Sequence, residues 1–548
     1  MEWVENSLTY SQDELSYYSR AFSVEQLTTK LLFARGITNE ELFSKYAYPS
    51  MADLHDPFLL SDMKKALVRI IRAMKNQEKI VIYGDYDVDG ITSAAILYRA
   101  LHFFKADVTA LLPTRRDGYG LTVSAIERMV LLDPALIITV DNGSNAHEAL
   151  RFAATKGIDV VVTDHHEING PFPTCHAFVN PKRSDNQYPN PNLCGAGVAF
   201  KIAQALFQAS STLEWRIHAW YYIELAALGT IADLMPLTGE NRLITKLGLS
   251  KMNLNPSPHL RVLFSLLNLS LIDSSTLSFL IAPILNSCGR ISDPNEALKA
   301  LISDEPQHEK LASFIELNKQ RKLMTQECFQ ILDQTIQNRK LHHQNVIVAQ
   351  GDYPEGLIGI LAAKVTDKYQ KPAIVITAEG KGSCRSVQNS SFSIINAISH
   401  CAESLKSYGG HQAAAGLTVE LHMFDHFNAE LQKAAALEPM KKPNKIYDSH
   451  LDICSFSNIL FEDMLLMEPF GMMNPKPIFL NSRSADSIQY FGNKEQHAKL
   501  NINNKEALLF NRAQLLKQDG LRPSFLYSTN SYEKKNFVIN ELNHQLFS

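Results

Sequence analysis

Three uninterrupted apolar runs constrain the fold of this chain more than any other feature of its sequence. KIVIY (79–83), ALIITV (135–140) and DVVVT (159–163) lack the alternation of polar and apolar residues that marks a half-exposed strand. Helical stretches separate these runs between Lys79 and about Gly239. Because buried strands alternate here with helices, the sequence predicts an α/β fold with a parallel sheet covered on both faces.

The remaining chain divides into further units, and 548 residues are enough for several cores. A helical apolar period from Asp304 to about Arg339 predicts a long connecting helix. A second α/β unit follows, with VIVAQ, a helix around Ile358–Tyr369 and PAIVIT (372–377), and short turn-broken runs after KKPNK (441–445) predict a small β-barrel. We therefore expect an N-terminal extension (1–50), a first α/β domain (51–240), a helical region (241–340), a second α/β domain (341–440) and a barrel (441–548).

Composition limits the classes of protein to which this chain can belong. A formal net charge of −4 means that any surface binding nucleic acid would have to be a local basic patch. The seven cysteines form no CxxC pair, which argues against a disulfide framework and a cysteine-bound metal. The acidic N-terminal stretch does not resemble a signal peptide, and apolar runs such as FLIAPIL (279–285) are too short to cross a bilayer. We expect a cytoplasmic enzyme with no membrane segment.

Three aspartates follow the first strand directly. Asp85, Asp87 and Asp89 lie between KIVIY and a helix that begins near Ile91, where open α/β sheets bind their ligands. The D-x-D-x-D-G run also matches the first half of a calcium-binding EF-hand loop, but its twelfth position is Ile96 instead of Glu, and a strand precedes it. No GK[ST] follows, which excludes a P-loop. Compared with a solvated acidic turn, a site for a hard metal ion is the favoured interpretation.

The next two strands end in the same way. ALIITV is followed by Asp141, and DVVVT is followed by the run Asp164, His165 and His166. Taken alone, an aspartate at a strand end is usually a cap for the next helix, and an exposed pair of histidines usually has no role beyond the surface. Three such strand ends in one α/β unit make that alternative improbable, because all of them meet at one edge of a parallel sheet. Asp233, an isolated carboxylate in ALGTIADLMPL, is a candidate fourth contributor.

The types of candidate ligand predict the metal and the chemistry. Carboxylates mixed with imidazole suit Mn²⁺, and Mg²⁺ less readily, while the absence of cysteine weakens the case for zinc. Two ions roughly 3.5–4 Å apart, bridged by one carboxylate, would clamp the attacking and leaving oxygens of an in-line displacement at phosphorus. The residues therefore predict hydrolysis of a phosphodiester or a phosphoanhydride.

Four motifs in order carry a family resemblance. DYDVDG, TVDNG, DHH and GTIADLMPL resemble the motifs of the DHH phosphoesterase superfamily, and GSCRS (382–386) with YGGHQAAAG (408–416) looks like its DHH-associated domain. LNSCGRISDP, ELNKQRKLMTQE, GLIGILAAK and EPFGMMNPKPIF resemble the bacterial single-strand-specific exonucleases of that superfamily. The resemblance spans roughly residues 50 to 500. It implies a DHH domain, a DHH-associated domain and a terminal barrel of the oligonucleotide-binding (OB) type.

The resemblance also implies roles for single residues. Asp141 is expected to bridge the two ions, His166 to hold the scissile phosphate, and Asp164 to orient the two histidines as a carboxylate behind the ligands. The backbone amides of the two glycines in the GGH turn would approach a phosphate oxygen. The implied metal ligands are Asp85, Asp87, Asp89, Asp141, His165 and Asp233, and the implied phosphate-binding residues are Asn286, Arg290, Arg385, Ser386, Gly409, Gly410 and His411.

The function implied by the resemblance is 5′→3′ release of mononucleotides from single-stranded DNA in repair and recombination. We expect a monomer, with a single-strand-binding protein and a DNA helicase as partners by family analogy. Two alternatives stay open: a DHH phosphodiesterase of short oligoribonucleotides or cyclic dinucleotides, and a non-catalytic replication scaffold. A narrow opening would select single strands, and four aromatic residues in the terminal domain are candidates either for base stacking or for its core: Tyr490, Phe491, Phe510 and Tyr527.

Three positions depart from the family pattern. Ile284 stands where an arginine is usual, Pro354 replaces a histidine, and Met473 replaces a glycine in FGMMNP. The first two changes remove side chains that would contact nucleic acid. Affinity for the strand is therefore expected to be lower or differently distributed, whereas none of the positions that resemble metal ligands is altered.

Overall fold

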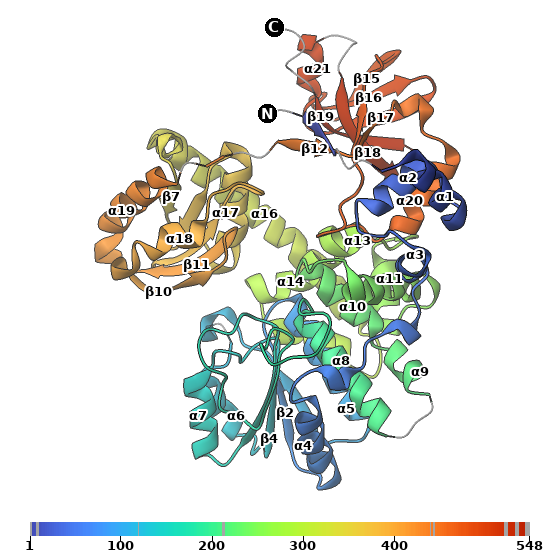
Figure 1. The fold of residues 1–548 in the computed structure, drawn as a ribbon. Coiled ribbons are helices and arrows are strands. Elements are labelled where there is room, and N and C mark those ends of the chain that lie inside the picture. The colour runs from blue at the N-terminus through green and yellow to red at the C-terminus, as the bar shows by residue number, and fades with distance from the viewer. Residues whose placement is uncertain are drawn as a thin grey trace.

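A computed structural model gives the fold shown in Figure 1, in which two α/β bodies and a β-rich body are joined by helices. None of the helices in the described part of the chain has the length and apolar character that crossing a membrane requires. The structure describes residues 3–6, 10–118, 120–210, 214–438, 440–441, 444–519, 524–531 and 536–542.

The first α/β domain is built on a five-stranded sheet of order β3-β2-β4-β5-β6, and every neighbouring pair is parallel. The three apolar runs form β2, β4 and β5, so the predicted parallel sheet is confirmed. The strands are β2 (Ile80–Tyr83), β3 (Val108–Leu111), β4 (Leu136–Val140), β5 (Asp159–Thr163) and β6 (Ala177–Val179).

Helices cover both faces of this sheet, which explains why its central strands show no alternation. One face packs against α4 (Met63–Lys75), α5 (Val88–Phe103) and α8 (Gly195–Ala209). The other face packs against α6 (Val123–Val130) and α7 (His147–Thr155) in a separate core. Alternate residues of each strand therefore enter different cores, and both sets must be apolar.

A helical region links this domain to the second α/β unit. Its longest helix, α16, was predicted as a connecting helix and runs for 31 residues. The same region contains a π-helical stretch, η4 (Leu277–Ile281), directly before α14. The helices are α9 (Trp215–Trp220), α10 (Ile223–Ala232), α11 (Gly239–Leu254), α12 (Pro258–Leu266), α13 (Ser274–Thr276), α14 (Ala282–Ile291), α15 (Pro294–Ile302) and α16 (His308–Asn338).

The second α/β domain has a mixed sheet of order β10-β11-β9-β8-β7, in which β7 and β8 alone are parallel neighbours. Helices α16 and α17 cover one face, while α18 and α19 cover the other. Its elements are β7 (Ile347–Gln350), α17 (Glu355–Tyr369), β8 (Ala373–Ile376), β9 (Lys381–Arg385), α18 (Ile394–Ser399), β10 (Leu405–Gly410), β11 (Ala414–Val419) and α19 (Phe424–Leu437).

The C-terminal domain shares its core with the first helices of the chain, which lie beside it in Figure 1. A seven-stranded sheet of order β13-β14-β18-β19-β17-β16-β15 packs against them. The elements are β1 (Trp3–Glu5), α1 (Gln12–Phe22), α2 (Gln26–Phe33), α3 (Glu40–Ala47), β12 (Lys445–Tyr447), β13 (Ser449–His450), α20 (Asn458–Met467), β14 (Phe479–Asn481), β15 (Ser487–Phe491), β16 (His497–Ile502), β17 (Lys505–Leu509), α21 (Ala513–Asp519), β18 (Phe525–Ser531) and β19 (Asn536–Leu542).

Arg242 fixes this C-terminal domain onto the helical region. The buried guanidinium, carried by α11, lies 3.5 Å from the ring centroid of Tyr46. It donates hydrogen bonds to the carbonyl oxygens of Leu466 (3.2 Å), Glu468 (2.8 Å) and Pro469 (3.3 Å). These carbonyls lie at and after the end of α20, where backbone acceptors lack partners within the helix. The contact therefore holds the segment after α20 against α11 of the helical region.

Candidate metal centre

The three aspartates after β2 form a tight turn into α5. Asp87 caps the helix, because its Oδ1 accepts a hydrogen bond from the backbone amide of Gly90 at 3.1 Å. Asp85 and Asp89 are buried, whereas Asp87 is partly exposed. A side chain at position 90 would place its Cβ 2.3 Å from the carbonyl oxygen of Asp85, so this turn requires glycine. The local sequence thus directs three carboxylates to one end of the strand.

Asp89 is oriented by a helix that the sequence did not single out. Its carboxylate accepts hydrogen bonds from the backbone amides of Gly195 (2.7 Å) and Ala196 (2.8 Å) at the start of α8. The positive end of the helix dipole stabilises such an anion. A Cβ at Gly195 would lie 2.5 Å from Cβ of Asp141, so the close approach of α8 also requires glycine. The run CGAG before an apolar helix was the signal that could have identified it.

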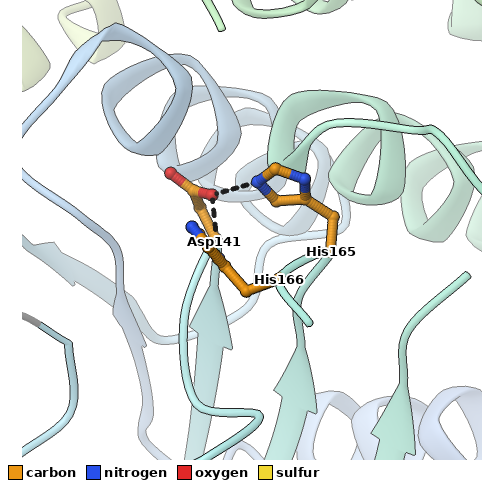
Figure 2. A group of neighbouring side chains, drawn as sticks. All are labelled: Asp141, His165 and His166. Carbon is orange, nitrogen blue, oxygen red and sulfur yellow. Dashed lines mark ion pairs between the residues drawn. The ribbon is translucent and has the colours of Figure 1, made fainter. Parts of the chain in front are cut away.

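Asp141, His165 and His166 converge where β4 and β5 end (Figure 2). Oδ1 of Asp141 lies 3.0 Å from Nε2 of His165 and 3.9 Å from Nδ1 of His166. Asp141 has a left-handed backbone with φ of 62°, which turns its carboxylate back over the strand ends. Both Asp141 and His165 are buried, while His166 is more exposed. Two neighbouring parallel strands thus deliver one carboxylate and two imidazoles to one place.

Asp164 holds the two histidines in place. Its Oδ1 accepts hydrogen bonds from the backbone amides of His165 (2.7 Å) and His166 (3.2 Å), and it lies 2.8 Å from Nδ1 of His166. Its Oδ2 accepts from the amide of Ser144 at 2.8 Å. Burial acts to raise the pKa of Asp164, but the hydrogen bond and charge of His166 outweigh it and lower the pKa below its usual range. Asp164 is therefore an ionised anchor whose lone pairs are directed at the turn.

Asp233 completes the cluster from a helix end. It caps the C-terminus of α10, and its Oδ2 lies 3.7 Å from Nε2 of His165. The ligand atoms form three groups, and within each group all of them lie within 4.8 Å of one another. The groups are Asp141 with His165 and His166, Asp89 with His165 and Asp233, and Asp85 with Asp87 and Asp141. All six residues expected to bind metal thus belong to one connected cluster, in which Asp141 takes part in two groups.

The electrostatics of the cluster favour a bound cation. Burial, with neighbouring carboxylates adding to it, raises the pKa values of Asp85 and Asp233 to about 8 and raises that of Asp141 well above its usual range. Burial also lowers the pKa of His165 to about 4, so its imidazole is neutral, the form that binds metals. Oδ1 of Asp141 and Oδ2 of Asp233 are buried and accept no hydrogen bond from the described residues. Oxygen donors with a neutral imidazole fit a divalent ion such as Mn²⁺.

Basic residues line the cluster on the side of the helical region. Arg290, on α14, is partly buried and donates to the carbonyl oxygen of Gly356 at 3.0 Å, which ties α14 to α17 of the second domain. Oδ1 of Asn286 accepts a hydrogen bond from the backbone amide of Val88 at 3.2 Å, so Asn286 supports the first turn of α5. Burial, with the nearby charges of Arg115 and Arg321 adding to it, lowers the pKa of Arg290 to about 10. Such a concentration of positive charge suits phosphate groups.

Arg115 is a candidate phosphate-binding residue that the sequence interpretation missed. It follows β3 at the same sheet edge as the aspartates, and its guanidinium lies 4.2 Å from the ring centroid of Tyr86. Its Nε donates to the carbonyl oxygen of Gly289 at 2.9 Å. The basic pair after the third strand, in PTRRD, was the available signal. Only the packing of α14 shows that Arg115 and Arg290 lie in one cluster.

We expect Arg115→Ala to raise the KM for a phosphodiester strand about 10–100-fold, because one charge-assisted hydrogen bond to phosphate contributes roughly 1.5–3 kcal/mol. Steady-state kinetics with varied strand concentration measure this change. Arg72→Ala is the matched control, since Arg72 pairs with Asp159 at the opposite edge of the sheet. An equal rise in KM in both variants would remove Arg115 from the site.

The phosphate-binding candidates of the second domain lie at one end of the neighbouring strands β9, β11 and β10. Arg385 ends β9 and donates to the carbonyl oxygen of Cys384 at 2.9 Å, and buried Ser386 donates to that of Phe392 at 3.0 Å. Gly409 and Gly410 end β10, and exposed His411 begins the turn into β11. The pairing of β11 with β9 places Ala414 opposite Arg385. The sheet thus brings the two motifs together, and the structure records no contact between these described residues and the metal cluster.

The three departures from the family pattern have different surroundings. Ile284 is buried in the core of the first domain, whereas Pro354 is exposed immediately before α17. Met473 is 64% exposed and has a left-handed backbone with φ of 59°. Ile284 and Pro354 therefore offer no charged side chain to a nucleic-acid strand, and Met473 exposes an apolar side chain.

The four aromatic candidates of the C-terminal domain divide into two kinds. Tyr527 belongs to the core, because it is fully buried and its hydroxyl donates to the carbonyl oxygen of Leu451 at 2.8 Å. Phe491 and Phe510 are 38% and 43% exposed. Tyr490 is partly buried, with Nζ of Lys517 4.9 Å from its ring centroid. Three of the four rings thus remain candidates for base stacking.

Comparison with known families matches the three bodies of the fold separately. The family model described as the DHH family, N-terminal domain, matches residues 79–230. The DHHA1 domain matches residues 343–437, and the RecJ OB domain matches residues 447–538. The last match assigns the seven-stranded sheet to the OB type.

Whole-chain comparison finds several relatives named single-stranded-DNA-specific exonuclease RecJ. The single-stranded-DNA-specific exonuclease RecJ of Bacillus subtilis is 33% identical over 93% of this chain and 66% of its own length. The protein of the same name from Dickeya dadantii is 31% identical over 74% of each chain. A crystal structure of RecJ in complex with Mn²⁺ from Thermus thermophilus superposes with a TM-score of 0.84 at 25% identity, covering 99% of this chain and 79% of that one.

Proposed function

Because the chain belongs to the RecJ family of single-stranded-DNA-specific exonucleases, we propose that it hydrolyses single-stranded DNA from one end with Mn²⁺ or Mg²⁺ as cofactor. One observation carries this proposal: carboxylates from three separate segments and the neutral imidazole of His165 from a fourth converge beside Arg115 and Arg290. Such a site combines cation ligands with phosphate-binding charge, as hydrolysis at phosphorus requires. The chain spans about two thirds of the length of the Bacillus relative.

The residues divide into ligands and groups that act on the substrate. Asp85, Asp87, Asp89, His165 and Asp233 would hold two ions, with Asp141 between them because it takes part in two of the three ligand groups. Bound there, the ions supply Lewis-acid stabilisation of the charge that develops on the phosphate oxygens.

His166 has the position and charge to bind the phosphate under attack. Burial lowers its pKa, but the hydrogen bond and charge of Asp164 outweigh this and raise the pKa to about 9, so the imidazolium is present at neutral pH. The charged ring can donate to a non-bridging oxygen while Asp164 keeps it oriented. Arg115 and Arg290 bind the flanking phosphates, and this fixes the strand in line with the cluster.

Polarity and biological role are finer proposals. We propose 5′→3′ release of mononucleotides by a monomer during repair and recombination, with a single-strand-binding protein and a helicase as partners on family analogy alone. A cytoplasmic location is supported by seven free cysteines, which suit a reducing compartment. Arg385, Ser386, Gly409, Gly410 and His411 of the second domain are proposed to bind the end of the strand that enters the site.

Two alternatives have less support. A phosphodiesterase of short oligoribonucleotides or cyclic dinucleotides does not account for the match to a RecJ OB domain over residues 447–538. A non-catalytic scaffold does not account for the connected ligand cluster, whose six members are all present. Both alternatives are outcomes of the experiment below.

The test uses purified full-length protein, Mn²⁺, and strands labelled at either the 5′ or the 3′ end. We expect metal-dependent release of labelled mononucleotide from the 5′-labelled single strand first, and little release from a blunt duplex. Rapid cleavage of a dinucleotide with slow cleavage of long strands would favour the short-substrate alternative. Equal digestion of single strand and duplex would contradict single-strand selectivity, and no hydrolysis with either metal would favour the scaffold.

A further inference from the structure

Two exposed apolar residues near the metal centre occupy backbone positions that favour glycine. Leu234 has φ of 54° and Met473 has φ of 59°. Their side chains are 67% and 64% exposed. A left-handed backbone is unfavourable for residues with a Cβ, and strained residues of this kind concentrate at functional sites. Both side chains are therefore left open to a partner from outside the chain.

Leu234 follows the metal-cluster residue Asp233 directly. The amide of Leu234 donates to the carbonyl oxygen of Ile231 at 3.2 Å, and the amide of Met235 donates to that of Thr230 at 3.1 Å. This pair of hydrogen bonds closes α10 in the Schellman arrangement, whose left-handed residue is usually glycine. The helix end that positions Asp233 therefore also projects a leucine side chain outward beside it.

Met473 lies at the tip of a tight turn in the C-terminal domain. The amide of Asn474 donates to the carbonyl oxygen of Gly471 at 3.2 Å, and the reverse bond measures 2.9 Å. The third position of such a turn favours glycine or asparagine when its φ is positive. The buried Asn474 side chain accepts from Nε of Arg35 (3.0 Å) and the hydroxyl of Tyr46 (3.1 Å). The base of the turn is thus held firmly while its tip is exposed.

The two segments are joined by hydrogen bonds. The amide of Leu237 donates to the carbonyl oxygen of Met472 at 2.8 Å, and Oγ of Ser274 donates to that of Phe470 at 2.7 Å. Met472 is itself 57% exposed. Leu234, Met472 and Met473, which we call the apolar ledge, therefore lie on two connected segments next to Asp233. In Figure 1 the C-terminal domain lies against this end of the helical region, near α10, α11 and α13.

We propose that the apolar ledge binds a nucleobase of the substrate strand beside the metal centre, and that Met473 is a specificity-determining residue of this chain. The inference rests on the proposed function. Leu234 directly follows the cluster residue Asp233, and the segment of Met472 and Met473 is hydrogen-bonded to Leu237 three residues later. A strand bound at the metal cluster is therefore the nearest occupant for the ledge. Thioether sulphurs make favourable contacts with aromatic rings, and leucine adds apolar surface against which a ring can pack. A base in a single strand has a free face for such a contact, whereas a stacked and paired base has none.

The test is Met473→Gly in the full-length protein. Glycine relieves the left-handed backbone, so the thermal midpoint of unfolding should rise. The KM for single-stranded DNA should nevertheless rise about 3–10-fold, the scale of one sulphur–aromatic contact, with kcat little changed. On a strand whose terminal nucleotides are abasic, wild type and variant should have equal KM. Gln77→Gly is the matched control, because Gln77 also has a positive φ, of 52°, and lies before β2 at the opposite sheet edge.

The outcomes separate this inference from the function on which it rests. If the wild type does not hydrolyse single strands, the proposed function fails and the ledge loses its occupant. If the wild type is active and Met473→Gly has an unchanged KM on base-bearing strands, the inference is overturned while the function stands. A KM that rises equally on abasic strands also overturns it, because the contact would then be to the backbone. Met473→Leu, which keeps an apolar side chain, should retain most of the affinity.

Discussion

Asp141→Asn is expected to lower the hydrolysis rate by about 10³-fold or more while leaving the metal-free protein at least as stable as the wild type. Asp141 takes part in two ligand groups, so the amide weakens both positions at once. Its Oδ1 is buried and accepts no hydrogen bond from the described residues, and burial raises its pKa well above the usual range. Replacing this buried carboxylate by an amide relieves its repulsion with the neighbouring carboxylates in the absence of metal.

Two measurements check this prediction together. Single-turnover hydrolysis gives the rate, and denaturant unfolding in the presence of a chelator gives the stability. Asparagine tolerates the left-handed backbone at this position, so strain does not confound the result. Asp133→Asn is the control, because Asp133 also has a positive φ, of 53°, but precedes β4 at the other sheet edge. Mn²⁺ should raise the unfolding midpoint of the wild type and of the control, and should raise that of Asp141→Asn much less. A variant with near-normal rate would disprove the role of Asp141.

Asp164→Asn is expected to affect stability more strongly than Asp141→Asn does. We expect a loss of about 3–5 kcal/mol in the free energy of unfolding. This carboxylate accepts hydrogen bonds from the backbone amides of Ser144, His165 and His166, and it pairs with the imidazole ring of His166. The asparagine side chain has no charge, and its NH₂ group cannot accept hydrogen bonds from the backbone amides that bind Asp164. Some of these buried N–H groups therefore lose their acceptor. The turn between β5 and the histidines should loosen.

The activity of Asp164→Asn should fall about 10–100-fold, which is the usual effect of removing a group that orients metal ligands. Denaturant unfolding and hydrolysis assays on the folded variant measure the two effects. Asp141→Asn serves as its counterpart, since the substitution is chemically identical and lies one strand away. If both variants lost stability equally, the distinction between a metal ligand and its support would be wrong.

The local part of this site could be predicted from the sequence alone. Apolar runs without alternation identified β2, β4 and β5, and in a parallel sheet their carboxyl ends meet at one edge. The residues directly after those ends, including Asp85, Asp141 and His165, therefore had to lie close together. Both the sheet and the predicted connecting helix are confirmed, because each follows from a periodicity within one segment.

Contacts between distant segments were not predictable in the same way. Nothing in the residues around Gly195 shows that its amide reaches Asp89, 106 positions earlier, or that Arg115 reaches the carbonyl of Gly289. The helices of the first 50 residues share a core with a domain that begins some 400 residues later, which no local pattern reveals. Such contacts depend on which apolar faces pack together, and many pairings of similar faces satisfy the same pattern.

The sequence by itself therefore determined the sheet, the set of carboxylates and histidines at its edge, and the metal chemistry that those residues support. Tertiary structure alone decided what surrounds them: the α8 amides on Asp89, the arginine cluster, and the Met473 turn against the segment after Asp233. The physical reason is that strand ends in a parallel sheet have one common edge. A residue of another domain reaches that edge only through the summed packing of every element between them.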